Sequence, residues 1–75
     1  MSKYAVVDTL HDGDWFEDIF ETEEEAVAYA ENEWDTFDDY EKLIRTAYYV
    51  ADVDVDEFDN IEHENKIIKT FKAWR

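Results

Sequence analysis

The chain of 75 residues carries 22 acidic and 7 basic side chains, a net charge of −15 and no cysteine. This length predicts a single domain over residues 1–75 with a small core, and the lack of cysteine excludes disulfides and thiolate metal sites as sources of stability. No apolar run is long enough for a signal peptide or a membrane span, which predicts a cytoplasmic protein without membrane contact.

The first predicted element is a β-hairpin. Residues 3–10 are rich in β-branched and aromatic side chains, and the Asp-Gly pair at 12–13 is a strong turn signal that predicts a return strand over residues 14–20. A two-residue turn would place Asp8 opposite Glu17, where like charges repel across the strands. A longer turn with a bulge is therefore an alternative.

A capping box marks the start of the first helix. Thr22 is followed three positions later by Glu25, so the helix is predicted to begin at Glu23. Apolar side chains then recur at helical spacing, and an acidic row lies roughly a quarter-turn away on the same helix. The apolar residues are Val27, Ala30, Trp34 and Phe37, and the acidic residues are Glu24, Glu31, Asp35 and Asp38.

A second cap signal follows. Thr36 with Asp39 three positions later is typical of a helix start, so we expect a break near this point. Tyr40 and Leu43 supply apolar side chains beyond the break. A short second helix is predicted over residues 37–45.

Residues 47–56 change to a period of two. Tyr49 and the apolar residues after it occupy one side, and three aspartates occupy the other, which predicts a half-exposed strand. Residues 57–64 have no consistent period and are interpreted as a loop.

The last predicted element is a strand over residues 65–74. Lys66 and Lys72 would share a face and could neutralise the aspartates of the preceding strand in a hairpin, while Lys69 would point the other way. Apolar residues at helical spacing, with Trp74 as the last, leave a helix as the alternative.

These elements have the order ββα(α)ββ. The predicted fold class is α+β with two layers, an antiparallel sheet of about four strands and helix packed on one face. Trp15, Trp34 and Trp74 are expected to provide much of the packing.

A calcium site is considered and rejected. Asp52, Asp54 and Asp56 match the first, third and fifth positions of an EF-hand loop. The sixth position has Glu57 in place of glycine, and the twelfth has His63 in place of glutamate. We predict no metal site and no cofactor.

Catalysis is not expected. Ser2 is the only serine, no glycine-rich phosphate loop is present, and His11 and His63 lack the close spacing of transition-metal ligands. The adjacent Glu17 and Asp18 would point to opposite faces of a strand, so they cannot form an acid and base pair. The sequence therefore predicts a protein that is not an enzyme.

The negative charge is concentrated in one part of the chain. Residues 1–41 contain fifteen acidic side chains against Lys3 alone, a charge of −14, whereas residues 42–75 contain seven acidic and six basic side chains. Concentrated charge destabilises the folded chain by self-repulsion, so we interpret it as a surface for a positively charged partner. Direct nucleic-acid binding is opposed, because phosphates would be repelled.

The spacing of this charge favours a nucleic-acid mimic. Carboxylates one helical turn apart are separated by roughly 6 Å along the axis, and one DNA strand presents a charge about every 3.4 Å. We expect the surface to occupy the basic groove of a nuclease or another nucleic-acid-binding protein and to inhibit it. The expected partner-binding residues are Asp14, Glu17, Asp18, Glu24, Glu31, Asp35, Asp38 and Asp39.

The alternative function is a non-catalytic protein-interaction or assembly module. Acidic residues along a helix are commonly a solvated face, and net charge alone keeps an aromatic-rich domain in solution. Exposed aromatics such as Tyr40 or Tyr48 would favour this alternative. The oligomeric state is left open by the sequence.

One pattern spans most of the chain. The segment Phe20-Glu-Thr-Glu-Glu-Glu-Ala26, followed by Trp34, by Asp39-Tyr40-Glu41-Lys42 and by Tyr48-Tyr49-Val50, resembles small uncharacterised proteins of bacteriophages and mobile elements of Gram-positive bacteria. In size and acidity the chain is also similar to phage anti-restriction and anti-CRISPR proteins, many of which act as DNA mimics. This resemblance implies a host nuclease as the target and assigns no active site.

Overall fold

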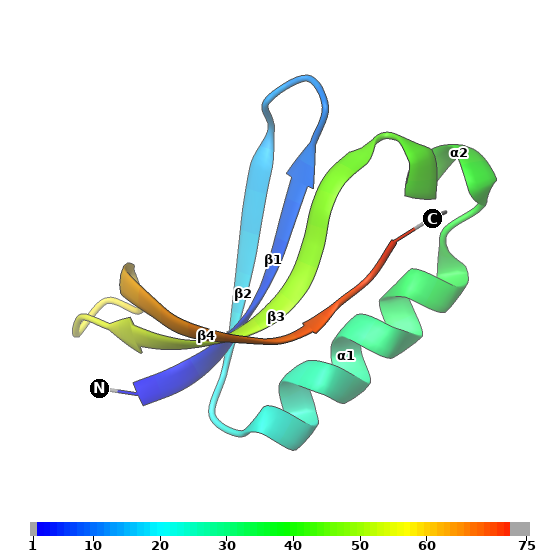
Figure 1. Cartoon of the computed structure of the whole chain (residues 1–75). Coiled ribbons are helices and arrows are strands. Elements are labelled where there is room, and N and C mark those ends of the chain that lie inside the picture. The colour runs from blue at the N-terminus through cyan, green and yellow to red at the C-terminus, as the bar shows by residue number, and fades with distance from the viewer. Residues whose placement is uncertain (1, 73–75) are drawn as a thin grey trace.

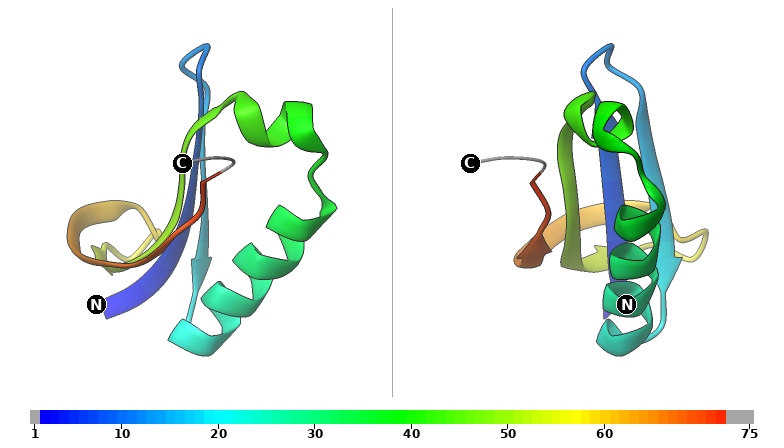
Figure 2. Two further views of the ribbon diagram at one scale, coloured as in Figure 1. Left: turned by 45° about the vertical axis from the view of Figure 1, so that its right-hand side comes forward. Right: turned by 90° about the vertical axis from the view of Figure 1, so that its right-hand side faces the viewer.

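The structure is a computed structural model that describes residues 2–72. Its elements are β1 (Ser2–Leu10), β2 (Trp15–Phe20), α1 (Glu23–Thr36), α2 (Asp39–Leu43), β3 (Arg45–Val55) and β4 (Ile61–Thr70). The strands form one antiparallel sheet in the order β2-β1-β3-β4. The helices lie on one face of this sheet (Figure 1 and Figure 2), which confirms the predicted α+β fold and element order.

The β1–β2 hairpin has the longer turn. Asp8 lies opposite Phe16, so it does not face Glu17 across the ladder. The Gly13 amide donates to the Leu10 carbonyl at 3.0 Å. Gly13 has a φ of 100°, a backbone angle that residues other than glycine rarely adopt. The turn chemistry thus sets a register that avoids the like-charge pair.

The capping residue of α1 is the predicted one. Thr22 is the N-cap, and the Glu25 amide donates to its hydroxyl oxygen at 3.2 Å. The Thr22 hydroxyl donates in turn to the Glu25 carboxylate at 3.1 Å. Three glutamates in the first turn lie at the positive end of the helix dipole, which favours this start.

The cap of α2 differs from the prediction. Asp38, rather than Thr36, is the N-cap: its carboxylate accepts from the Glu41 amide at 2.8 Å, and its amide donates to the Glu41 carboxylate at 3.1 Å. The Thr36 hydroxyl instead donates to the Glu33 carbonyl at 2.7 Å and closes the end of α1. The second helix is therefore shorter than predicted.

β3 is a central strand that is covered on both faces. On the helix side Tyr48 and Val50 are 1% and 0% exposed, and on the other side Val53 is 0% exposed. The predicted alternation is observed only from Ala51 on, because α1 covers the helix side of the first part of the strand. The aspartates that follow, Asp52 and Asp54, are half-buried.

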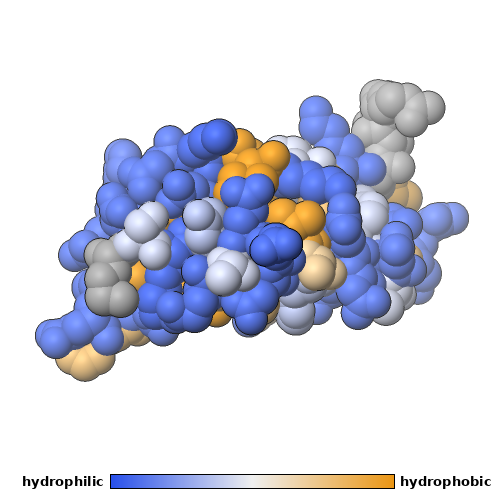
Figure 3. All heavy atoms as spheres, turned by 90° about the horizontal axis from the view of Figure 1, so that it is seen from below, coloured by the Kyte–Doolittle hydropathy of each residue, from blue (hydrophilic) through white to orange (hydrophobic). Residues whose placement is uncertain are grey.

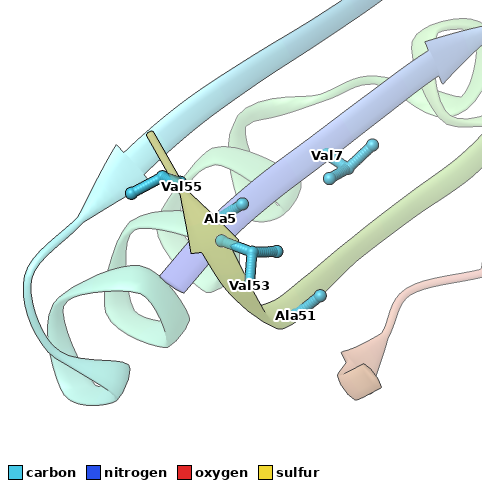
Figure 4. Close-up of a cluster of buried hydrophobic side chains, with 5 residues drawn as sticks. All are labelled: Ala5, Val7, Ala51, Val53 and Val55. Atoms are coloured by element: carbon cyan, nitrogen blue, oxygen red, sulfur yellow. The ribbon is translucent and has the colours of Figure 1, made fainter. Parts of the chain in front are cut away.

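Two hydrophobic clusters lie on opposite faces of the sheet. The helix-side cluster joins Val6, Ala26 and Ala30 to Tyr48 and Val50. The second cluster joins residues of β1 and β3 on the face away from the helices, and Figure 4 shows its five side chains. Its members are Ala5, Val7, Ala51, Val53 and Val55.

The predicted tryptophans have different surroundings. Trp34 is packed in the helix-side cluster, where its ring stacks on Tyr48 with centroids 5.5 Å apart. Trp15 is 60% exposed, so its predicted role in the packing was wrong. Trp74 lies outside the described residues.

β4 begins earlier than predicted. Residues 61–64, predicted as loop, belong to the strand. The prediction missed them because three register shifts between β3 and β4 hide the period of two. One shift falls beside Val50 and turns Lys69 toward α1, where it pairs with Glu31. Lys66 lies opposite Asp52, as the predicted hairpin required, whereas Lys72 follows the end of the strand.

Candidate functional site

The solvent side of α1 carries the predicted acidic row. Glu24, Glu31 and Asp35 are exposed, and their spacing of seven and four residues places them on one side of the helix. Glu31 forms an ion pair with Lys69 of β4. Glu24 and Asp35 have no ion pair among the residues that the structure describes, so they face solvent with their charge uncompensated.

The remaining helical acids, Asp38 and Asp39, begin α2. Asp38 is occupied as the N-cap, and Asp39 is exposed in the first turn. The end of α2 lies beside the hairpin turn, since the His11 amide donates to the Ile44 carbonyl at 2.8 Å. Asp14 is exposed in that turn. The hairpin and α2 therefore meet at one end of the molecule (Figure 1).

Glu17 and Asp18 lie on opposite faces of the sheet, as predicted. Glu17 faces away from the helices beside Val7, and Asp18 lies opposite Val6 on the helix side. Glu17 is half-buried, and one of its carboxylate oxygens has no hydrogen-bond partner within residues 2–72.

Burial, and then the nearby Glu64 carboxylate, raise the pKa of Glu17 above its ordinary value of 4.5. This carboxylate therefore belongs to a partly buried site and does not share a surface with the α1 row. Glu17 is thus separated from the helical acids and from Asp18, which lie on the other side of the sheet.

The sequence did not predict a groove of about 400 Å³ between α1 and the β1–β2 strands. Its polar lining includes four acidic residues, Asp8, Glu17, Asp18 and Glu33, and the guanidinium of Arg45, although Glu17 turns its side chain to the other face of the sheet. We call this the α1–β2 groove. Apolar and aromatic side chains complete its walls, among them Val6, Phe16, Tyr29 and Phe37.

Glu33 is held by two tyrosines. The Tyr48 hydroxyl donates to one carboxylate oxygen at 2.9 Å, and the Tyr29 hydroxyl donates to the other at 2.9 Å. Burial, together with these hydrogen bonds to Glu33, raises the pKa of both phenols far above the ordinary value of 10.0. Both tyrosines therefore stay protonated and keep the Glu33 side chain in place.

Arg45 lines the groove beside Asp8. Its Nε lies 3.1 Å from Asp8 Oδ1, its Nη1 donates to the Glu41 carbonyl at 2.6 Å, and its guanidinium lies 3.7 Å from the centre of the Phe37 ring. Burial nevertheless raises the pKa of Asp8 above its ordinary value of 3.8, an effect that Arg45 opposes.

Comparisons with known protein families, with curated proteins and with solved structures found no match. Within residues 2–72, no cluster of three or more histidine, aspartate or glutamate side chains could hold a metal ion. No helix of the described residues is both long and apolar enough to span a bilayer. The surface seen from below is largely hydrophilic with a few small apolar patches (Figure 3).

Two sequence signals point to the groove residues. Asp8 continues the alternation of Tyr4 and Val6 on one side of β1, which places a carboxylate on a packed face. Glu33 directly precedes Trp34, at the border of the apolar stripe of α1. Neither signal distinguishes these two acids from their exposed neighbours without the pairing of the strands.

Proposed function

We propose that this protein binds a basic nucleic-acid-binding protein, such as a nuclease, in place of nucleic acid and thereby inhibits it. The observation that carries the proposal is the shortage of internal counter-charges. Within residues 2–72, ion pairs engage four carboxylates, and the other acidic side chains keep their charge for the solvent or a partner. The paired residues are Asp8, Glu21, Glu31 and Asp59.

The row on α1 supports the comparison with DNA. Glu31 and Asp35 are separated by roughly 6 Å along the helix axis, and Glu24 and Glu31 by roughly 10 Å, with the charge of Glu31 partly compensated by Lys69. A DNA strand carries a charge about every 3.4 Å, so the row is less dense than DNA but of the same order. Such a surface steers a basic partner toward it and gives association that weakens with added salt.

The test compares two variants that lose the same charge. Glu24→Gln with Asp35→Asn removes two exposed carboxylates from α1, and Glu57→Gln with Glu62→Gln removes two exposed carboxylates elsewhere. The tagged protein is used to capture partners from a bacterial lysate at low and at high salt. We expect nucleic-acid enzymes to be captured at low salt, to be displaced by excess duplex DNA, and to be lost with the α1 variant alone.

Capture that resists both DNA and the α1 substitutions would refute the mimic. The interaction module is then favoured, because large side chains are exposed: Trp15 is 60%, Tyr40 70% and Phe58 76% exposed. In that case Trp15→Ala or Tyr40→Ala abolishes capture, while the α1 variant retains it.

A further inference from the structure

We propose that the α1–β2 groove receives an arginine or lysine side chain of the basic partner. This inference rests on the proposed function and names the group that the partner inserts. Four acidic residues line the groove, Asp8, Glu17, Asp18 and Glu33, against the single guanidinium of Arg45. Even without Glu17, whose pairing with Val7 turns its side chain to the other face, the lining has an excess of two negative charges in a concave space, where water screens them less than on an open surface.

Arg45 shows what the walls can bind. Its guanidinium contacts a carboxylate, that of Asp8, and at the same time lies on an aromatic ring, that of Phe37. A planar cation with five donors matches this combination of an acid and a ring. The groove thus already contains one cation, which the chain itself supplies.

The groove also offers carboxylates and rings without a cation. Asp18 and Glu33 supply the carboxylates, and neither forms an ion pair within the described residues. Phe16 and Tyr29 supply rings that are 55% and 37% exposed. Because Glu33 is held by hydroxyl groups and Asp18 is exposed, both carboxylates can accept hydrogen bonds from a partner.

The dimensions allow a side chain to enter. A volume of about 400 Å³ lies in the range of roughly 300–1,000 Å³ typical of pockets that bind small molecules. The groove is also placed for contact, since Phe16 lies on exposed edge strand β2. A cationic side chain is therefore favoured over a neutral or anionic group by charge, and over a bare metal ion by the aromatic walls.

The probe for the test is an acetylated and amidated hexa-arginine peptide. It is titrated at low salt into the uniformly ¹⁵N-labelled protein, and affinity and contact site are read from amide chemical shifts. Two pairs of variants are compared. Phe16→Ala is matched with Trp15→Ala, because these neighbours on β2 are similarly exposed but point to opposite faces of the sheet. Asp18→Asn is matched with Asp35→Asn, which removes the same charge from the outer side of α1.

We expect Phe16→Ala and Asp18→Asn each to weaken binding by roughly three- to ten-fold, and their matched controls by less than about two-fold. The largest shifts are expected at Phe16, Asp18, Tyr29 and Glu33. Equal losses of affinity in both members of each pair would contradict peptide binding in the groove, because net charge alone would then hold the peptide. The proposed nucleic-acid mimicry would not be affected by this result. If the peptide does not bind at all, the proposal that the groove receives a cationic side chain is wrong. The nucleic-acid mimic is tested separately, by capture from the lysate and displacement with DNA.

Discussion

The Tyr48 hydroxyl on central strand β3 donates a 2.9 Å hydrogen bond to the Glu33 carboxylate on α1, and so joins the two layers of the fold. Removal of this donor by Tyr48→Phe is expected to cost roughly 1–2 kcal/mol of the free energy of unfolding, because the acceptor is charged and partly buried. Urea denaturation of the wild type and the variant measures this loss.

Tyr29→Phe is the matched control. It removes the other hydroxyl from Glu33, but Tyr29 is 37% exposed, so water replaces the lost donor. A smaller loss than that of Tyr48→Phe is expected. An equal or larger loss would show that the bond between the layers is not the stronger of the two.

Arg45 and Asp8 form the most buried ion pair within the described residues, with side chains 12% and 15% exposed. Arg45→Met is expected to destabilise the protein by roughly 2–4 kcal/mol, because it leaves the Asp8 carboxylate buried without its cation. The double variant Asp8→Asn with Arg45→Met is expected to recover part of that loss. If the double variant is less stable than Arg45→Met alone in urea denaturation, the unpaired charge is not the cause.

Glu17 is expected to make stability depend on pH. Its pKa is raised in the folded state, so between its ordinary value of 4.5 and the folded pKa the folded chain binds more protons than the unfolded chain. Stability contributed by Glu17 is therefore present at low pH and falls as pH rises through this window. The stability contributed by Asp8 likewise falls as pH rises above 3.8, since burial raises its pKa too.

Glu17→Gln tests this sign. The variant is expected to have a higher melting temperature at neutral pH than the wild type, and a flatter dependence of the melting temperature on pH above 4.5. Glu57→Gln changes the net charge equally at an exposed position outside the helices and controls for general repulsion. Equal gains from the two variants would exclude a special role of the partly buried carboxylate.

Added sodium chloride is expected to stabilise the protein. With a net charge of −15, screening reduces the self-repulsion of the folded chain. If screening adds about 1 kcal/mol, the melting temperature of a domain of this size rises by roughly 4–8 °C. Calorimetry between low and moderate salt checks this, and a flat or falling melting temperature would contradict concentrated repulsion.

Local signals in the sequence predicted much of the fold. The Asp-Gly turn and the Thr22 cap depend on neighbouring residues, and both lie where they were expected. The second cap was also marked locally, because Asp38 with Glu41 three positions later is a capping-box signature, whereas Thr36 with Asp39 lacks the glutamate. Between the two helices Phe37 packs against Tyr48, with ring centres 5.7 Å apart.

The candidate site was less predictable, because it depends on contacts between residues that are far apart in the sequence. The exposure of Glu24 and Asp35 follows from the helical period alone, whereas the burial of Glu17 follows from the assembled sheet, and Glu64, which raises its pKa further, lies far away in the sequence. The groove likewise requires α1 to cross β1 and β2, which no local pattern specifies. Register shifts between β3 and β4 add a further long-range feature that the period of two conceals.

The sheet separates two hydrophobic clusters, and β1 and β3 contribute to both of them. Loosening of α1 would open the cluster that contains Ala26 and Ala30 and leave the cluster around Val53 closed. The amide hydrogens of α1 should therefore exchange with solvent by partial opening, while those at the centre of β1 and β3 should exchange only when the whole chain unfolds.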